Sequence, residues 1–158
     1  MKFFTIGVYN STEDEYFKKL TDNNIDTFCD IRQIRGVRGA KYSFVNSNRL
    51  QSKLNDLKIK YFHITGLAPT SELRALQKKD DASKGELQRS RSSIGVEFIK
   101  AYTDLILSKF DINAFVSELK GNGAKRVVLF CVEENPEACH RSIVAKELEK
   151  LGHKTKHL

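Results

Sequence analysis

Short apolar segments recur along this chain and alternate with stretches that have helical periodicity. Such segments are typical of strands that are buried on both faces of a parallel sheet. The alternation of strand, helix and strand predicts a single α/β domain over residues 1–158, with three layers and a mostly parallel central sheet. The expected strands are residues 3–8, 25–31, 59–64 and 126–132, and residues 153–158 form a plausible edge strand.

Helix signals lie between these runs. A capping box at Thr12–Glu15 opens the first helix, and Asn46 or Ser47 caps the second. Apolar residues at helical spacing predict further helices over residues 94–108 and 113–120, and a last one that stops at Gly152. A helix over residues 71–79 is possible within a long polar stretch, residues 65–93, that we otherwise expect to be a loop, either a functional lid or disordered.

The charge balance points to anionic partners. The 158 residues carry a formal net charge of +7, which favours phosphates, nucleotides or nucleic acid, although ordinary solubilising surface explains the same balance. No apolar run is long enough to span a bilayer, and the N-terminus lacks a secretory signal. We therefore expect no membrane partner and a cytoplasmic location.

A basic loop, residues 32–44, follows the second expected strand. Its arginines alternate with glycines and precede Tyr42 and Phe44, a pattern that can grip a phosphate backbone and stack a base. The alternative is a solvated loop whose two aromatic residues cap the core.

The carboxyl ends of parallel strands meet at one edge of the sheet, where ligands bind in folds of this kind. The polar and reactive residues at these expected ends are Asp30, Arg32, His63, Cys131 and Glu133. Side chains from distant stretches of the sequence are therefore expected on a single rim.

Cys139, His140 and Arg141 lie at or near the first turn of the last helix, which starts at Asn135-Pro136 or near Cys139. Exposed backbone N–H groups and the helix dipole favour an anion there and lower the pKa of a cysteine. We expect Cys139 to be the nucleophile or a redox-active thiol, and Arg141 to bind the anion. The alternative is that Cys139 is buried and inert, while Arg141 forms a structural ion pair with Asp30 or Glu133.

A metal site is a further possibility. Cys131, Cys139 and His140 could bind zinc together with one of His63, His153 or His157. The spacing from Cys131 to Cys139 is not that of a short C-x-x-C knuckle. The odd number of cysteines, three, also argues against a disulfide framework.

These motifs resemble the domain-of-unknown-function family 488 over essentially the whole chain. The resemblance implies an α/β fold and no agreed reaction, although nucleotide or nucleic-acid processing has been considered for such proteins. The stretch Ser92–Val96 departs from the Tyr/Met-rich element of many family members. The matching residues are Thr5-Ile6-Gly7, Asp30-Ile31-Arg32 with Arg38, Tyr61-Phe62-His63-Ile64 with Gly66-Leu67, Leu129-Phe130-Cys131-Val132-Glu133, Cys139-His140-Arg141-Ser142 and His157.

The leading interpretation is an enzyme that acts on a phosphorylated, nucleotide or nucleic-acid substrate. It assigns no cofactor and no metal ligand, and the chain lacks the C-x5-R, Walker lysine and G-x-G-x-x-G motifs. The alternatives are a non-catalytic nucleic-acid-binding module and a metal-binding structural or regulatory protein. The expected catalytic residues are Cys139, His140, Glu133 and Asp30, and the expected substrate-binding residues are Arg32, Arg38, Arg141 and His63.

Overall fold

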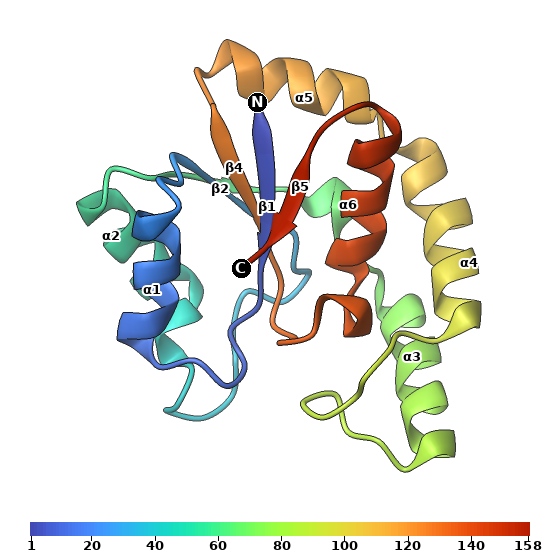
Figure 1. Ribbon diagram of the computed structural model, residues 1–158. Helices are drawn as coiled ribbons and strands as arrows, with labels where there is room; N and C mark the ends of the chain where they lie inside the picture. The colour runs from blue at the N-terminus through green and yellow to red at the C-terminus, as the bar shows by residue number, and fades with distance from the viewer.

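The central sheet of the computed structural model, which describes residues 1–158, has five strands that all run parallel (Figure 1). Their order across the sheet is β3-β2-β4-β1-β5. The expected α/β fold and all five expected strands are thereby confirmed. The strands are β1 (Lys2–Ile6), β2 (Thr27–Asp30), β3 (Lys60–His63), β4 (Arg126–Phe130) and β5 (Thr155–His157).

The register of the strands brings their carboxyl ends to one level. Phe130, the last residue of β4, pairs with Ile6 of β1 on one side and with Asp30 of β2 on the other. Asp30 in turn pairs with His63, the last residue of β3. The segments that follow these four strands therefore start at the same edge of the sheet.

The helices cover both faces of the sheet. In Figure 1, α1 and α2 lie on one side, and α6, α4 and α3 lie on the other, which gives the three layers. None of the helices is long and apolar enough to cross a membrane. The helices are α1 (Glu13–Asp22), α2 (Ser47–Asp56), α3 (Ser71–Lys84), α4 (Val96–Leu105), α5 (Ile112–Gly121) and α6 (His140–Lys150).

The expected capping box at the start of α1 is present. The backbone N–H of Glu15 donates to the Thr12 hydroxyl at 3.3 Å, and the backbone N–H of Thr12 donates to the Glu15 carboxylate at 2.8 Å. The two contacts satisfy N–H groups that the first turn of a helix leaves free. The helix then buries Tyr16, Phe17 and Leu20 against the sheet and its neighbours.

The helix considered over residues 71–79 is present and continues to residue 84 as α3, so the expectation of a long loop over residues 65–93 was wrong for that part of the stretch. The Thr70 side chain caps the helix by accepting the Leu73 N–H, and Gly85 ends it in the left-handed conformation at φ 67°. The segment has few apolar residues because α3 buries polar Gln77 and Asp81 beside Leu73. The buried face of α3 therefore does not appear as an apolar stripe in the sequence.

Two buried tyrosines allow a test of how much a hydrogen bond of a buried hydroxyl group contributes to stability. Tyr16 Oη has no hydrogen-bond partner, whereas the Tyr102 hydroxyl donates to the Leu67 carbonyl at 2.6 Å. We expect Tyr16→Phe to leave the free energy of unfolding within about 0.5 kcal/mol of wild type or to raise it, and Tyr102→Phe to lower it by about 1–2 kcal/mol. Urea denaturation of both variants checks this, and a larger loss in Tyr16→Phe would contradict it.

Candidate functional site

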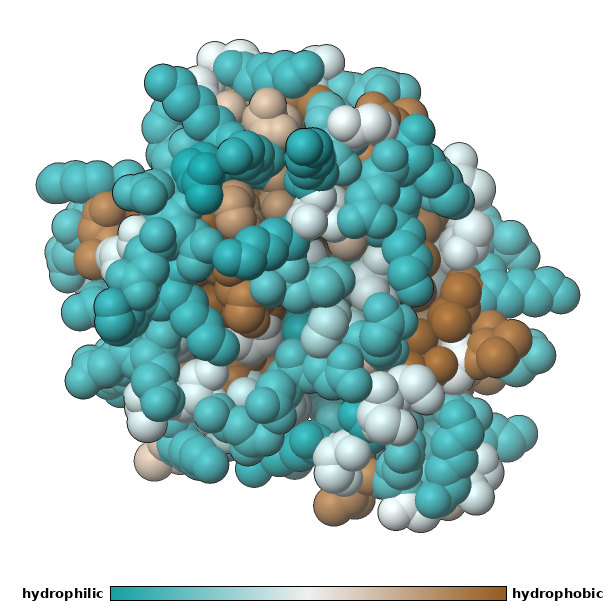
Figure 2. All heavy atoms as spheres, in the orientation of Figure 1, coloured by the Kyte–Doolittle hydropathy of each residue, from teal (hydrophilic) through white to brown (hydrophobic).

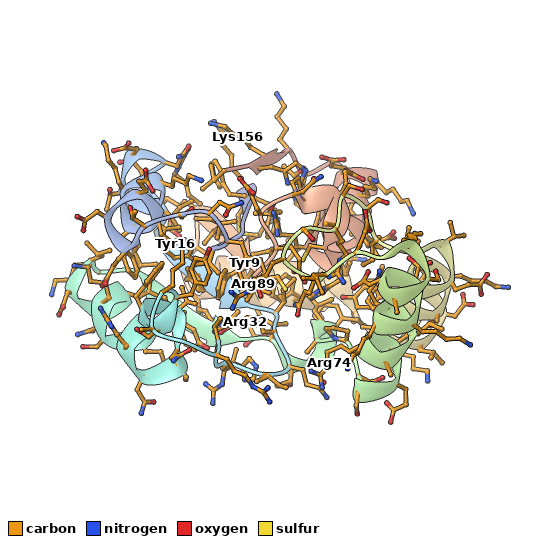
Figure 3. The ribbon with its side chains drawn as sticks, turned by 90° about the horizontal axis from the view of Figure 1, so that it is seen from below. Tyr9, Tyr16, Arg32, Arg74, Arg89 and Lys156 are labelled. Atoms are coloured by element: carbon orange, nitrogen blue, oxygen red, sulfur yellow. The ribbon has the colours of Figure 1, made fainter.

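A cleft of about 1130 Å³ lies at the carboxyl edge of the sheet. In Figure 3, which looks onto this edge, Tyr9, Arg89 and Arg32 are grouped near the centre, and Arg74 projects from α3 at the side. The segments that line the cleft follow β1, β2 and β4 or belong to α3, to the loop after α3 and to the start of α6. The expected convergence of distant segments on one rim is therefore present in the fold.

The topology explains why the hollow forms here. The chain leaves β1 through α1 on one face of the sheet and leaves β4 through α6 on the opposite face (Figure 1). Because β1 and β4 are neighbours, a crevice opens between their carboxyl ends. The segments that follow β1 and β4 remain in contact with each other. The N–H groups of Val8 and Tyr9 both donate to the Val132 carbonyl at 3.1 Å.

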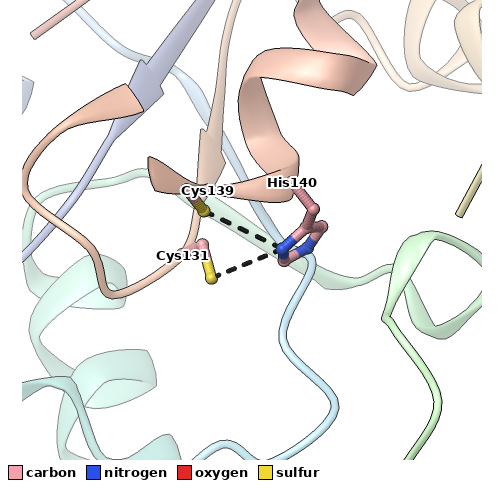
Figure 4. Close-up of side chains that lie close together, drawn as sticks. All are labelled: Cys131, Cys139 and His140. Atoms are coloured by element: carbon pink, nitrogen blue, oxygen red, sulfur yellow. Dashed lines mark hydrogen bonds between the residues drawn. The ribbon is translucent and has the colours of Figure 1, made fainter. Parts of the chain in front are cut away.

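Two thiols and an imidazole form a cluster in this crevice (Figure 4). Cys131 follows β4, Cys139 is the N-cap residue of α6, and His140 is its first residue. His140 Nδ1 lies 3.8 Å from the sulfur of Cys131 and 3.8 Å from that of Cys139. The last helix thus starts at the later of the two expected positions, after a short 3-10 turn over Pro136–Ala138.

Cys139 is more deeply placed than Cys131. Cys139 is only 1% exposed and does not line the cleft. Cys131 and His140 both line it. Burial acts to raise the pKa of Cys139, but the hydrogen bond to Cys131 and the charges of His140 and Arg141 outweigh it and hold this pKa well below its usual value. Cys139 is shielded from the cleft, so the alternative interpretation was correct that this residue is buried.

The Glu133 carboxylate is buried beside the cluster and also lines the cleft. The Cys131 thiol donates to its Oε2 at 3.3 Å, and Oε1 accepts from Arg91 at 2.7 Å and from Gln88 at 3.0 Å. Burial and the nearby Cys139 charge raise the pKa of Glu133 to about 7, against the opposing effect of Arg91.

Arg91 ties three segments together at the wall of the cleft. Its buried guanidinium pairs with Asp81 of α3 at 2.9 Å and with Glu133 at 2.7 Å, and it donates to the Ala138 carbonyl at 2.9 Å. The sequence shows only a polar Arg-Ser-Arg-Ser stretch here. No local pattern indicates that one arginine is buried while its neighbour Arg89 is exposed.

Arg32 and Asp30 form a bidentate ion pair at the bottom of the cleft. Arg32 Nε and Nη2 donate to the two Asp30 oxygens at 2.9 and 2.7 Å, and the guanidinium lies 4.4 Å above the centre of the Phe130 ring. Arg32 Nη1 is buried without a protein partner, and Arg32 lines the cleft. Asp30 is fully buried and outside the lining, so it positions Arg32 and does not itself reach the space where a substrate would bind.

Arg141 differs from its expected role. Its guanidinium donates to the Thr5 hydroxyl at 3.3 Å, to the Glu134 carbonyl at 2.7 Å and to the Glu133 carbonyl. The residue is 1% exposed and lies outside the cleft lining, so it braces the loop after β4 and has no nitrogen free for an anion. It forms none of the ion pairs with Asp30 or Glu133 that the alternative interpretation named.

The three histidines suggested as a further metal ligand also lie elsewhere. His63 Nε2 contacts the Arg32 carbonyl at 2.9 Å and is not part of the cleft lining. His157 Nδ1 lies 2.6 Å from the Thr5 hydroxyl, and His153 packs against the Phe3 ring. None of them joins the cluster of Cys131, Cys139 and His140.

Four cations that line the cleft form no ion pair with a carboxylate: Arg38, Arg74, Lys78 and Arg89. Arg38 comes from the basic loop, as expected, but Arg74 and Lys78 were not among the expected site residues, because nothing in the sequence of their possible helix places it beside the cleft. The Arg89 guanidinium lies 5.5 Å from the centre of the Tyr9 ring and 5.7 Å from that of Tyr42. Tyr42 and Phe44 are buried and cap the core, as the alternative for this loop stated.

The fold and the site define an all-parallel α/β protein with a cysteine–histidine cluster beside a basic cleft at the carboxyl edge of its sheet. The chain belongs to the family described as domain of unknown function DUF488, whose model matches residues 12–148. The search of the curated proteins and the search of the solved structures both found no match.

Proposed function

We propose that this protein is an enzyme that acts on a phosphorylated substrate, with nucleotides or nucleic acid as the substrate class. One observation carries the proposal: unpaired cations and the reactive side chains Cys131, Glu133 and His140 line the same cleft. Cationic side chains without a carboxylate partner are free to pair with an anion, and several of them around one cleft attract it together.

The rest of the lining favours a ligand that has an apolar part as well as a charged part. Ile34 and Leu87 line the cleft and are 58% and 74% exposed, which is unusual for large aliphatic side chains. Ligand sites commonly combine such apolar surface with a few well-placed polar groups. A nucleotide, with a base and at least one phosphate, has this composition, whereas inorganic phosphate lacks the apolar part.

The roles proposed for the expected catalytic residues follow from their access to the cleft. Cys131, Glu133 and His140 are placed to contact a bound substrate, whereas Cys139 supports them from behind. Arg32 offers Nη1 to the substrate from the bottom of the cleft, held in position by Asp30. All three cysteines are free thiols, which suits a reducing compartment such as the cytoplasm.

Calorimetry with pyrophosphate and a panel of mononucleotides tests whether the cleft binds phosphate-containing ligands. We expect Arg89→Ala and Arg74→Ala each to weaken pyrophosphate binding by about tenfold, since each removes a charge-assisted hydrogen bond. Arg49→Ala is the matched control, because Arg49 is an exposed arginine that pairs with Glu13 outside the cleft. Equal affinities in all three variants would place anion binding elsewhere and contradict the proposal.

The second candidate is a nucleic-acid-binding module without catalysis, favoured by the exposure of Arg38, Arg74, Lys78 and Arg89. Such a module would bind single-stranded RNA or DNA with an affinity that falls steeply with salt. Cys131→Ser would leave its binding unchanged. A bound nucleotide or oligonucleotide recovered without chemical change after long incubation would favour the module over the enzyme.

A further inference from the structure

We infer that Cys131, Cys139 and His140 form a binding site for one zinc ion, with a coordination position that opens into the basic cleft. The inference rests on the proposed function only where it relates that open position to a substrate. The metal site itself is argued from the positions of the three side chains.

The distances from the imidazole nitrogen to the two sulfurs are close to those around a tetrahedral zinc ion. Zn–S bonds of about 2.3 Å and Zn–N bonds of about 2.0–2.1 Å place a sulfur and a nitrogen ligand about 3.6 Å apart. His140 Nδ1 lies 3.8 Å from each of the two sulfurs, and all three donor atoms lie within 4.8 Å of one another. Small side-chain adjustments would therefore be enough to close the three atoms around an ion.

The imidazole is oriented as a metal ligand would be. His140 Nε2 lies 3.1 Å from the carbonyl oxygen of Ile31, which can only accept a hydrogen bond. Nε2 therefore carries a proton, and in the neutral imidazole the lone pair of Nδ1 is directed toward both sulfurs. A histidine ligand is normally held by such a hydrogen bond from its other ring nitrogen.

Hydrogen bonding alone does not account for the cluster as well as a metal does. The Cys131 thiol has its hydrogen-bond acceptor in Glu133, yet His140 Nδ1 lies equally far from the sulfurs of Cys131 and Cys139, so hydrogen bonding does not explain why all three donor atoms converge. A divalent cation would interact with all three donors at once and would balance the charge of two buried thiolates. Two thiolates and one imidazole are a ligand set that zinc favours.

The backbone around the ligands is fixed by contacts that do not involve a metal. Arg141 donates to the carbonyls of Glu133 and Glu134, and so fixes the loop that follows Cys131. The Ser142 hydroxyl donates to the Cys139 carbonyl at 2.9 Å. The site is therefore held ready before an ion binds, as tight metal sites require.

The fourth position faces the cleft. Cys139 closes the rear of the cluster, whereas Cys131, His140 and Glu133 line the open side. Glu133 Oε1 is held by Arg91 and Gln88, which leaves Oε2 directed toward Cys131. Zinc sites with three protein ligands and one open position are typical of catalysis, and closed four-ligand sites are typical of structural roles.

The first test measures metal in the wild-type chain, purified without a metal-affinity tag and without chelators. We expect elemental analysis to give about one zinc ion per chain. After the metal is stripped and Co²⁺ is added, thiolate-to-cobalt charge transfer and the visible bands of a tetrahedral site should appear. A stripped chain that fails to take Zn²⁺ from a chromophoric chelator of micromolar affinity overturns the inference.

Variants assign the ligands. Cys131→Ser, Cys139→Ser and His140→Gln should each weaken zinc binding by at least about a hundredfold. Cys29→Ser is the matched control, because Cys29 is a buried thiol of β2 outside the cluster, and it should bind as wild type does. If a ligand variant does not fold, alkylation of the wild type decides instead: added Zn²⁺ must protect Cys131 and Cys139, and unprotected thiols would overturn the inference.

Pyrophosphate binding, measured on the same samples, distinguishes failure of the zinc site from failure of the proposed function. A chain that binds zinc but no pyrophosphate or nucleotide supports the metal site and removes the proposed function. A chain that binds these anions, yet never holds zinc, overturns the metal site and leaves the proposed function standing.

Discussion

Gly7→Ala is expected to lower the free energy of unfolding by about 3 kcal/mol or more, because an added methyl group has no room at this position. Its Cβ would overlap the carbonyl oxygen of Glu133 and lie 3.1 Å from Arg141 Nη1. Both neighbours are held by their own hydrogen bond, so the ends of β1 and β4 would have to separate. Guanidinium denaturation measures the change in stability.

Gly121→Ala provides the control for this substitution. Gly121 is the last residue of α5, and a Cβ there would meet nothing within 4 Å. Alanine is the better helix former, so this variant should be as stable as wild type or slightly more stable. Equal stability of the two variants would show that β1 and β4 are not packed as closely as described at this point.

Arg141→Met is expected to cost about 3–5 kcal/mol of stability. The methionine fills much of the space, but the carbonyls of Glu133 and Glu134 and the hydroxyl of Thr5 lose their donor. Unpaired polar atoms in the interior cannot recover those hydrogen bonds from water. Thermal and chemical unfolding should both show the loss.

Arg141→Lys and Lys150→Met complete this series. Lysine keeps the charge but cannot reproduce the planar fork that reaches three acceptors, so Arg141→Lys should lie between wild type and Arg141→Met. Lys150 is an exposed residue of the same helix, and its replacement should change the stability by less than about 0.5 kcal/mol. A wild-type stability for Arg141→Met would mean that the loop after β4 does not depend on this side chain.

Much of the fold could be predicted from the sequence, because its central strands β1, β2 and β4 are buried on both faces and therefore appear as mostly apolar runs. Val127, Val128 and Leu129 of β4 show this pattern, and all three are fully buried. The prediction was weakest at α3, which was considered only as a possible helix over residues 71–79 within a loop, because Gln77 and Asp81 are buried there in place of apolar residues. Gln77 donates to Asp81 and accepts the Gly95 N–H, a pairing that depends on the tertiary structure.

The sequence was enough to predict which segments meet at the candidate site. It was not enough to predict which of their side chains face the cleft. The parallel topology brings Arg32, Cys131 and His140 to one edge, as expected. Neighbouring residues on a helix point in directions about 100° apart, so the orientations of Cys139 and Arg141 depend on how α6 is rotated against the sheet. That rotation is fixed by packing, which a single sequence does not reveal.

The reactive side chains of the cleft and most of its unpaired cations come from separate parts of the chain. Cys131, Cys139, His140 and Glu133 belong to one short stretch around the end of β4 and the start of α6. Three of the four unpaired cations, Arg74, Lys78 and Arg89, come from α3 and the loop behind it, and the fourth, Arg38, comes from the basic loop. Substitutions, insertions or deletions in the second part can therefore alter ligand preference without disturbing the reactive groups. Relatives with this architecture can diversify in what they recognise while they retain a common chemistry.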